Sequence, residues 1–272
     1  MSYITVANVR TASGAPSSLI SDSDIEHAIS IVEPQVERQM NTKFKPTHRI
    51  DVLDGIDKDR IYTDKNPLLK VKSLKSNDSS ITASSLIIDK GPGRIRFGDD
   101  SEASQFVVKA HNVIIEYYFA YLIEDDDNRT TTNGAIVAGS SIDVVLDDAE
   151  SFAVDDWVEI YGVDGFREVA KITAVVGTTM TVDNLIFSHV DGSIFVKQKI
   201  PEFIQRYMEL EAAIYVAISA IGETYTFNAS YQLADLQVTK GVPYTHWRES
   251  VEKCIKERET LRKRIKPRFC IR

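Results

Sequence analysis

The side chains that usually carry out catalysis or hold metal ions are scattered through this sequence. No His-Glu-x-x-His motif brings two histidines together for zinc. The Gly-x-Ser-x-Gly motif that positions a nucleophilic serine is also absent. We therefore expect no enzymatic activity, no cofactor and no metal site. The five histidines stand singly, at His27, His48, His111, His189 and His246.

Neighbouring carboxylates, glycines and one cysteine favour structural interpretations. The acidic run 124–127 lacks the central glycine and terminal glutamate of a calcium loop, which favours a solvated linker. Asp155 and Asp156 are adjacent, and adjacent strand residues point to opposite faces, so they indicate a turn before a strand rather than an acid–base pair. Gly91-Pro-Gly93 precedes an expected strand, which favours a turn over a phosphate-binding loop. Cys254 lies on an apolar seam and is expected to be a small core residue.

The C-terminal end is the most informative chemical feature. Residues 248–272 contain 10 basic and 4 acidic side chains, net +6, and no acid follows Glu259. One interpretation is a solvated helix face, and Glu249 with Lys253 at i, i+4 supports it. The other is a contact with protein acids or DNA phosphates, in which apolar anchors supply affinity and cations supply steering. The residues of this predicted contact are Arg262, Lys263, Arg264, Lys266, Arg268, Phe269, Ile271 and Arg272.

Composition limits the class of protein. The 272 residues are 43% hydrophobic and carry 32 basic and 40 acidic side chains, net −8, as in ordinary globular proteins. Residues 124–199 hold 5 basic and 15 acidic side chains, net −10, so the charge is concentrated in one segment. No apolar run approaches the roughly 18 residues that span a bilayer, and residues 1–10 do not resemble a secretion signal. Cys254 and Cys270 alone make neither a disulfide framework nor a zinc site, so we expect a protein made in a reducing cytosol.

Helical periodicity occurs near both ends of the chain. Apolar residues at helical spacing predict a helix over roughly 22–42, with Ser23 and Glu26 as its capping box. Pro34 lies inside this pattern and predicts two short helices or one bent helix.

Pro201 starts a further helix that is apolar on most sides and is expected to end at Gly222. A helix of this kind is either central or shared between subunits. The last helix is expected from about 245 to 266, with an apolar seam of coiled-coil width. The residues predicted to lie at a subunit interface are Phe203, Tyr207, Ile214 and Ile218.

Between these helices the hydrophobic period changes to two, which predicts strands. The polar run 124–134 separates two sets of strands, and the second set is typical of a small barrel or sandwich that folds alone. Val176-Gly177-Thr178 predicts a tight hairpin in that set. The first set is expected at 49–53, 59–63, 68–75, 84–89, 93–97 and 106–119. The second is expected near 135–138, 142–146, 152–161, 167–176, 179–183 and 193–199.

Eight segments follow one another in an informative order. They are Tyr3-Ile-Thr-Val, Ser21-Asp-Ser-Asp-Ile-Glu-His-Ala-Ile29, Val36-Glu-Arg-Gln-Met-Asn-Thr-Lys-Phe44, Asn66-Pro-Leu-Leu-Lys-Val-Lys-Ser-Leu74, Ile87-Ile-Asp-Lys-Gly-Pro-Gly-Arg-Ile-Arg-Phe97, Val113-Ile-Ile-Glu-Tyr-Tyr118, Ile200-Pro-Glu-Phe-Ile-Gln-Arg-Tyr207 and Tyr231-Gln-Leu-Ala-Asp-Leu-Gln-Val238. In order and spacing they resemble the head–tail connector (adaptor or head-completion) proteins of tailed viruses. The resemblance covers about 1–123 and 200–272, and the chain departs from it at 124–199.

The resemblance implies an α+β fold: a helical connector core with a small β-sheet region, formed by 1–123 and 200–272, and an inserted acidic all-β domain at 124–199. It implies a structural virion protein that forms a ring of copies of itself, commonly twelve, at the head–tail interface. The implied partners are the portal protein, which the basic tail would bind, and a stopper or tail-terminator protein. DNA would pass through the centre of the ring without sequence-specific contacts, and no membrane is involved.

Two alternatives stay open. One is another tail or baseplate component that carries a binding β domain. The other is a carbohydrate-active enzyme or binding protein whose acidic β domain is the working part.

Overall fold

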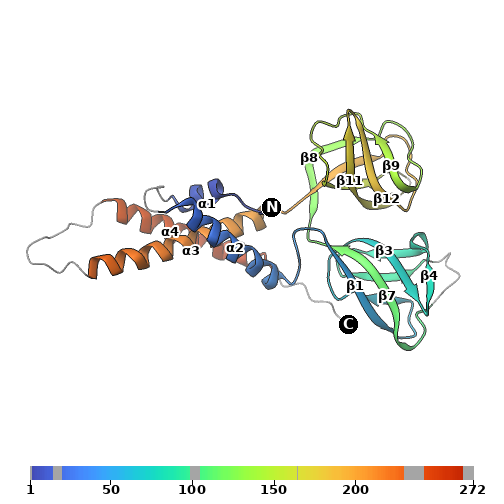
Figure 1. Ribbon diagram of the computed structural model, residues 1–272, viewed down its shortest axis with the longest axis horizontal. Coiled ribbons are helices and arrows are strands. Elements are labelled where there is room, and N and C mark those ends of the chain that lie inside the picture. Colours follow the sequence, from blue (N-terminus) through green and yellow to red (C-terminus); the bar gives the residue numbers. More distant parts are fainter. Residues whose placement is uncertain (1, 15–19, 99–104, 164, 230–241, 266–272) are drawn as a thin grey trace, which may run out of the picture. The chain divides into compact units, whose positions relative to one another are not determined.

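The computed structural model describes the chain except for residues 1, 15–19, 99–104, 164, 230–241 and 266–272. Internal contacts divide it into two compact units. The first, the helical unit, combines Met1–Asn41 with Ile200–Pro267, and the second, the β unit, contains Thr42–Lys199. Figure 1 shows the helices of the first unit and the strands of the second.

The described part of the chain is mostly β, and this corrects the expected fold class. It contains 13 strands in three antiparallel sheets and four α-helices, so the expected α+β fold, with a helical connector core and a small β-sheet region, is wrong. The reason is that strands between residues 47 and 119 bury a complete hydrophobic core of their own. That segment is a full β module and not a small sheet attached to helices.

This first β module, which we call the sandwich, consists of two antiparallel sheets. Their strand orders are β1-β7-β3-β4 and β2-β6-β5. Side chains from both sheets, among them Ile95, Phe97 and Tyr117, belong to one buried cluster. The strands are β1 (Thr47–Gly55), β2 (Arg60–Tyr62), β3 (Leu68–Ser76), β4 (Ser79–Ile81), β5 (Leu86–Asp89), β6 (Arg94–Phe97) and β7 (Lys109–Phe119), with a 3-10 turn at Ala83–Ser85.

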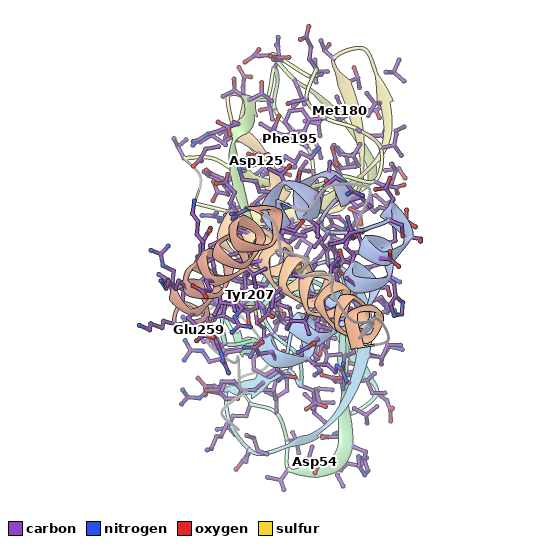
Figure 2. The ribbon with its side chains drawn as sticks, turned by 90° about the vertical axis from the view of Figure 1, so that its left-hand side faces the viewer. Asp54, Asp125, Met180, Phe195, Tyr207 and Glu259 are labelled. Carbon is purple, nitrogen blue, oxygen red and sulfur yellow. The ribbon has the colours of Figure 1, made fainter. Side chains whose placement is uncertain are left out.

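The second β module, which we call the barrel, is a six-stranded sheet in the order β8-β13-β10-β11-β12-β9. A bridge between Thr132 and Leu146 joins the ends of β8 and β9, so the two outer strands meet and the sheet closes. Figure 2 marks Met180 and Phe195, both fully buried in its core. The strands are β8 (Ile123–Thr131), β9 (Gly139–Val145), β10 (Trp157–Tyr161), β11 (Arg167–Val176), β12 (Thr179–Leu185) and β13 (Ile194–Lys199).

The acidic run 124–127 lies within strand β8 and is not the expected linker. Asp125 is buried, accepts a hydrogen bond from the Asn128 amide at 2.6 Å and pairs with Lys199 at 2.9 Å. Burial alone would raise the pKa of Asp125, but these contacts outweigh it and the pKa is lowered. The buried carboxylate of Asp125 is thus stabilised by specific donors, which lets this acidic segment form a strand.

The helical unit contains α1 (Val6–Ser13), α2 (Asp22–Met40), α3 (Glu202–Ala229) and α4 (Val242–Arg262). Helix α3 packs against each of the other three. It continues through Gly222, so the expected end at that glycine is wrong. None of the helices in the described residues is long and apolar enough to cross a membrane.

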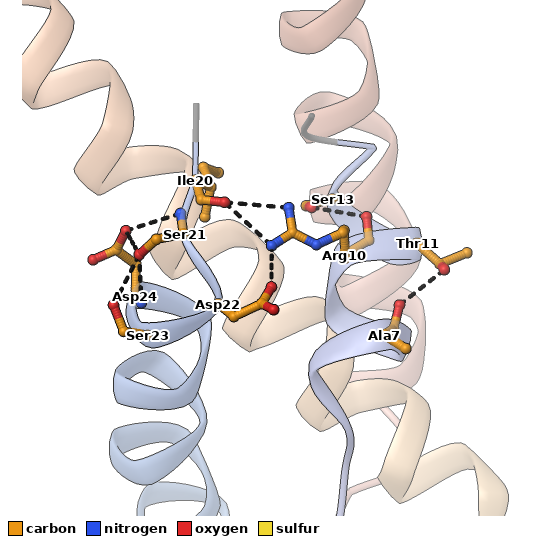
Figure 3. Close-up of polar contacts among 9 residues, drawn as sticks. All are labelled: Ala7, Arg10, Thr11, Ser13, Ile20, Ser21, Asp22, Ser23 and Asp24. Atoms are coloured by element: carbon orange, nitrogen blue, oxygen red, sulfur yellow. Dashed lines mark hydrogen bonds and ion pairs between the residues drawn. The ribbon is translucent and has the colours of Figure 1, made fainter. Parts of the chain in front are cut away.

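Helix α2 begins with a capping box two residues earlier than the sequence indicates (Figure 3). The Ser21 hydroxyl accepts a hydrogen bond from the Asp24 backbone N–H, and the Asp24 carboxylate accepts one from the Ser21 N–H at 3.1 Å. Ser23, the expected cap, lies inside the first turn. The helix is unbroken through Pro34, so the two-helix alternative is wrong.

Candidate functional site

Three of the four residues predicted for a subunit interface lie against their own helical unit. Tyr207 is 2% exposed and Ile214 is 5% exposed, whereas Phe203 is half-buried. Burial, together with a hydrogen bond to Glu211, raises the pKa of Tyr207 to about 12. The inward face of α3 is therefore already occupied by neighbouring helices of the same chain.

The outward face of α3 carries apolar side chains that this unit leaves open. Ile218 is 61% exposed and Tyr215 is 41% exposed. Residues three apart on a helix are surface neighbours, so these two side chains form one apolar strip. The sequence prediction includes Ile218 but misses Tyr215, although their spacing is visible in the sequence.

Helices α3 and α4 are joined by ion pairs around a small apolar cluster. Arg206 binds Glu257 at 2.8 Å, and this pairing lowers the pKa of Glu257. Cys254 is buried beside Leu210 and Ile214, as its position on the apolar seam predicts. Burial raises the pKa of the Cys254 thiol, which keeps it protonated and structural.

The basic end of α4 is exposed where the structure describes it. Arg262, Lys263 and Arg264 are all exposed, and Arg262 lies 3.6 Å from Glu259. Ile265 is 6% exposed, so an apolar residue anchors this end. The other residues of the predicted contact, Lys266, Arg268, Phe269, Ile271 and Arg272, lie outside the described residues.

The β unit holds a network of charged side chains around one buried carboxylate, which the sequence does not reveal. Glu159 is 5% exposed and accepts hydrogen bonds from Lys90 of the sandwich and from Arg167 of the neighbouring strand β11. Burial alone would raise the pKa of Glu159, but Arg167 and Lys90 outweigh it and the pKa is lowered. Glu159 therefore remains ionised and holds a sandwich residue against the barrel.

A cavity of about 350 Å³ lies beside this network, lined by strands of both β modules. Lys70 in its wall is almost fully buried and binds Asp183 at 2.8 Å and the Asn184 carbonyl at 2.7 Å. Phe166 and Phe187 stack at 4.5 Å along the same wall. The ammonium group of Lys70 is bound by Asp183 and Asn184, so it does not present a free charge to the cavity. The surface that lines the cavity is mainly apolar.

Four other titratable candidates, His48, Asp155, Asp156 and His189, make ordinary structural contacts. His189 is buried and lies 2.9 Å from Glu168, and His48 lies 2.8 Å from Glu116. Asp155 and Asp156 form the expected turn before β10 but bind different lysines, Lys171 and Lys197. Within the described ranges, no group of three or more His, Cys, Asp or Glu side chains could hold a metal ion.

Comparison with known proteins adds no family assignment. No protein-family model matches the chain, and no curated protein matches it.

Proposed function

We propose that this chain is a structural protein of a tailed virus, which assembles with copies of itself into a ring between the portal of the head and the tail or stopper. The ring would let DNA pass through its centre and would carry out no reaction. Segments of 1–44 and 200–238 carry part of the resemblance to head–tail connectors. The finding that 1–41 and 200–267 share one helical unit supports this proposal.

The observation that carries the proposal is the open apolar strip on α3. The inward side chains of this helix are buried within the unit, yet Ile218 and Tyr215 stay exposed. Exposed apolar side chains grouped on one helix are typical of protein contact surfaces. A copy of the same chain supplies a partner in equal amount, and head-to-tail contacts between copies close into rings.

The basic end of α4 gives the ring a second surface. Arg262, Lys263 and Arg264 are exposed, which suits electrostatic steering toward an acidic partner. We propose the portal as that partner, with the segment beyond Ile265 completing the contact. The −10 charge of residues 124–199 keeps that segment from holding the DNA phosphates.

The mass of the purified assembly tests the ring. We expect native mass spectrometry to give a single multiple of the chain mass and electron microscopy to show a hollow ring. Ile218→Glu should abolish the ring while leaving the circular dichroism spectrum unchanged, because a carboxylate would be buried between copies. Val163→Glu is the matched control, since Val163 is a 97% exposed valine on the barrel. A wild-type protein that stays monomeric, with and without portal, would refute the proposal.

A further inference from the structure

The outer face of the three-stranded sheet β2-β6-β5 is unusually rich in arginine. In the antiparallel register Arg60 lies opposite Arg96, and Tyr62 lies opposite Arg94. Between these rows Ile61 and Ile95 pair and point into the core, where they are 3% and 0% exposed. Because successive strand residues alternate between faces, the three arginines share the outer face.

Among the residues that the structure describes, this arginine face (Arg60, Arg94 and Arg96) is only partly neutralised. Arg94 binds Asp89, which lies opposite it on β5. Within the described ranges, Arg60 pairs only with its sequence neighbour Asp59, at 3.3 Å, and Arg96 makes no ion pair. Like charges directly opposite each other destabilise a sheet. An external group of negative charge would remove this repulsion.

The barrel carries exposed carboxylates that have no cationic partner among the described residues. Between β9 and β10, Asp147, Asp148 and Glu150 are all exposed, and none forms an ion pair with a described lysine or arginine. They make local hydrogen bonds instead: Thr131 donates to Asp147, and the Asp148 backbone N–H donates to Thr130 at 3.1 Å.

Several other acids of the barrel form ion pairs. Asp155 and Asp156, for example, bind Lys171 and Lys197. The loop from Asp147 to Glu150, which we call the acidic loop, therefore concentrates negative charge that the described part of the chain leaves without cations. It belongs to the segment with net charge −10.

We propose that the arginine face of one copy docks on the acidic loop of the next copy. This inference rests on the proposed ring, and it names a contact within that ring. Because the two surfaces differ, the contact is head-to-tail and continues from copy to copy until the ring closes. Complementary charge speeds association and fixes the register, while the apolar strip on α3 supplies buried area.

A second copy suits this surface better than nucleic acid does. Every copy carries one arginine face and one acidic loop, so the charges match in equal number. Three arginines, one of them already paired with Asp89, neutralise few phosphates, and the chain as a whole is acidic at net −8.

Charge reversal tests the contact in the full chain. We expect Arg60→Glu/Arg96→Glu to raise the concentration needed for half-assembly by about tenfold or more, because the contact becomes repulsive. Asp147→Arg/Asp148→Arg should do the same. An equimolar mixture of the two double variants should assemble again, since each altered surface then meets a complementary one, and this rescue excludes misfolding as the cause. Lys75→Glu/Lys109→Glu is the matched control, with the same charge change at exposed residues of the other sheet.

The outcomes separate this inference from the proposed function. A wild-type ring that Arg60→Glu/Arg96→Glu leaves intact overturns the contact but not the ring. A wild type that never assembles overturns both. Failure of the mixture to assemble also overturns the contact. So does an arginine variant that assembles normally but loses binding to a double-stranded DNA probe, because that result assigns the face to nucleic acid.

Discussion

Glu159 shows how one residue connects the two modules of the β unit. It is 5% exposed, and Arg167 and Lys90 both donate to it. Removing one partner of a buried ion pair usually costs more than the pair contributes, because the other charges stay desolvated. Here Lys90 and Arg167 retain side-chain exposures of 32% and 48%, so water can reach them and moderates the cost.

We predict that Glu159→Gln lowers the free energy of unfolding at pH 7 by about 1–3 kcal/mol. The folded-state pKa of Glu159 lies below its reference value of 4.5, so its contribution is complete above that pH and is lost as the pH falls through the folded-state pKa. The stability difference between wild type and variant should therefore stay constant from about pH 7 to 5 and shrink below about pH 4.5. Urea unfolding at a series of pH values measures it.

Asp126→Asn is the control for this prediction. Asp126 is an exposed carboxylate of the same barrel outside the acidic loop, and its substitution should change stability by less than about 0.5 kcal/mol. A Glu159→Gln difference that grows toward acid pH would contradict the assigned role of Glu159.

Gly93 illustrates what residue types alone can indicate. Gly91-Pro-Gly93 is predicted to be a turn, and it joins β5 to β6 with Gly93 at φ +68°. A Cβ at this glycine would lie 2.4 Å from the Thr63 hydroxyl. The turn follows from the sequence, but the close approach of Thr63 does not, because it depends on how the chain continues after strand β2.

At the scale of elements, two substitutions test which of two serines caps helix α2. Ser21→Ala should lower the free energy of unfolding of the helical unit by about 1 kcal/mol, because the Asp24 backbone N–H loses its acceptor. Ser23→Ala, which removes the cap predicted from sequence, should cost clearly less. Thermal unfolding followed by circular dichroism compares the two, and an equal or larger effect of Ser23→Ala would place the cap at Ser23 after all.

Elements that depend on local signals could be predicted from the sequence. The turn Gly177-Thr178 joins β11 to β12 as expected, and Val176 pairs with Thr179 across it.

The sequence does not predict helix α1, although Thr5 caps it, because its apolar pattern is too short to stand out. Strand β8 was missed because its stability comes from distant partners such as Lys199. Contacts across long sequence separations have no local signature.

The same limit applies to the candidate surfaces. The α3 residues were identified by their apolar character, but whether each points inward or outward depends on packing against α1, α2 and α4. The arginine face was not predicted at all, because it exists only once β2 and β6 pair in the observed register.

At the scale of the whole molecule, the division proposed from sequence, 1–123 with 200–272 against 124–199, stays a prediction. Ile123 and Lys199 are paired residues of neighbouring strands, so the two ends of the barrel segment lie side by side. We expect that replacing 124–199 with a short Gly/Ser linker leaves the remaining chain cooperatively folded.

Differential scanning calorimetry of this deletion variant checks the division. The sandwich should keep a cooperative transition at a somewhat lower temperature, because Lys70 and Lys90 lose Asp183 and Glu159. A variant without any cooperative transition would show that the barrel is integral to the fold of the rest.

The helical unit is assembled from the two ends of the polypeptide, and this has a consequence during synthesis. Helices α1 and α2 leave the ribosome before the whole β unit, and α3, the helix against which they pack, follows only after Lys199. At about 5–20 residues per second, this leaves a wait of roughly 10–30 s. During that time the apolar side of α2, including Ile25, Val32 and Val36, has no native cover. The nascent chain is thus an expected client of a ribosome-associated chaperone until α3 has been translated.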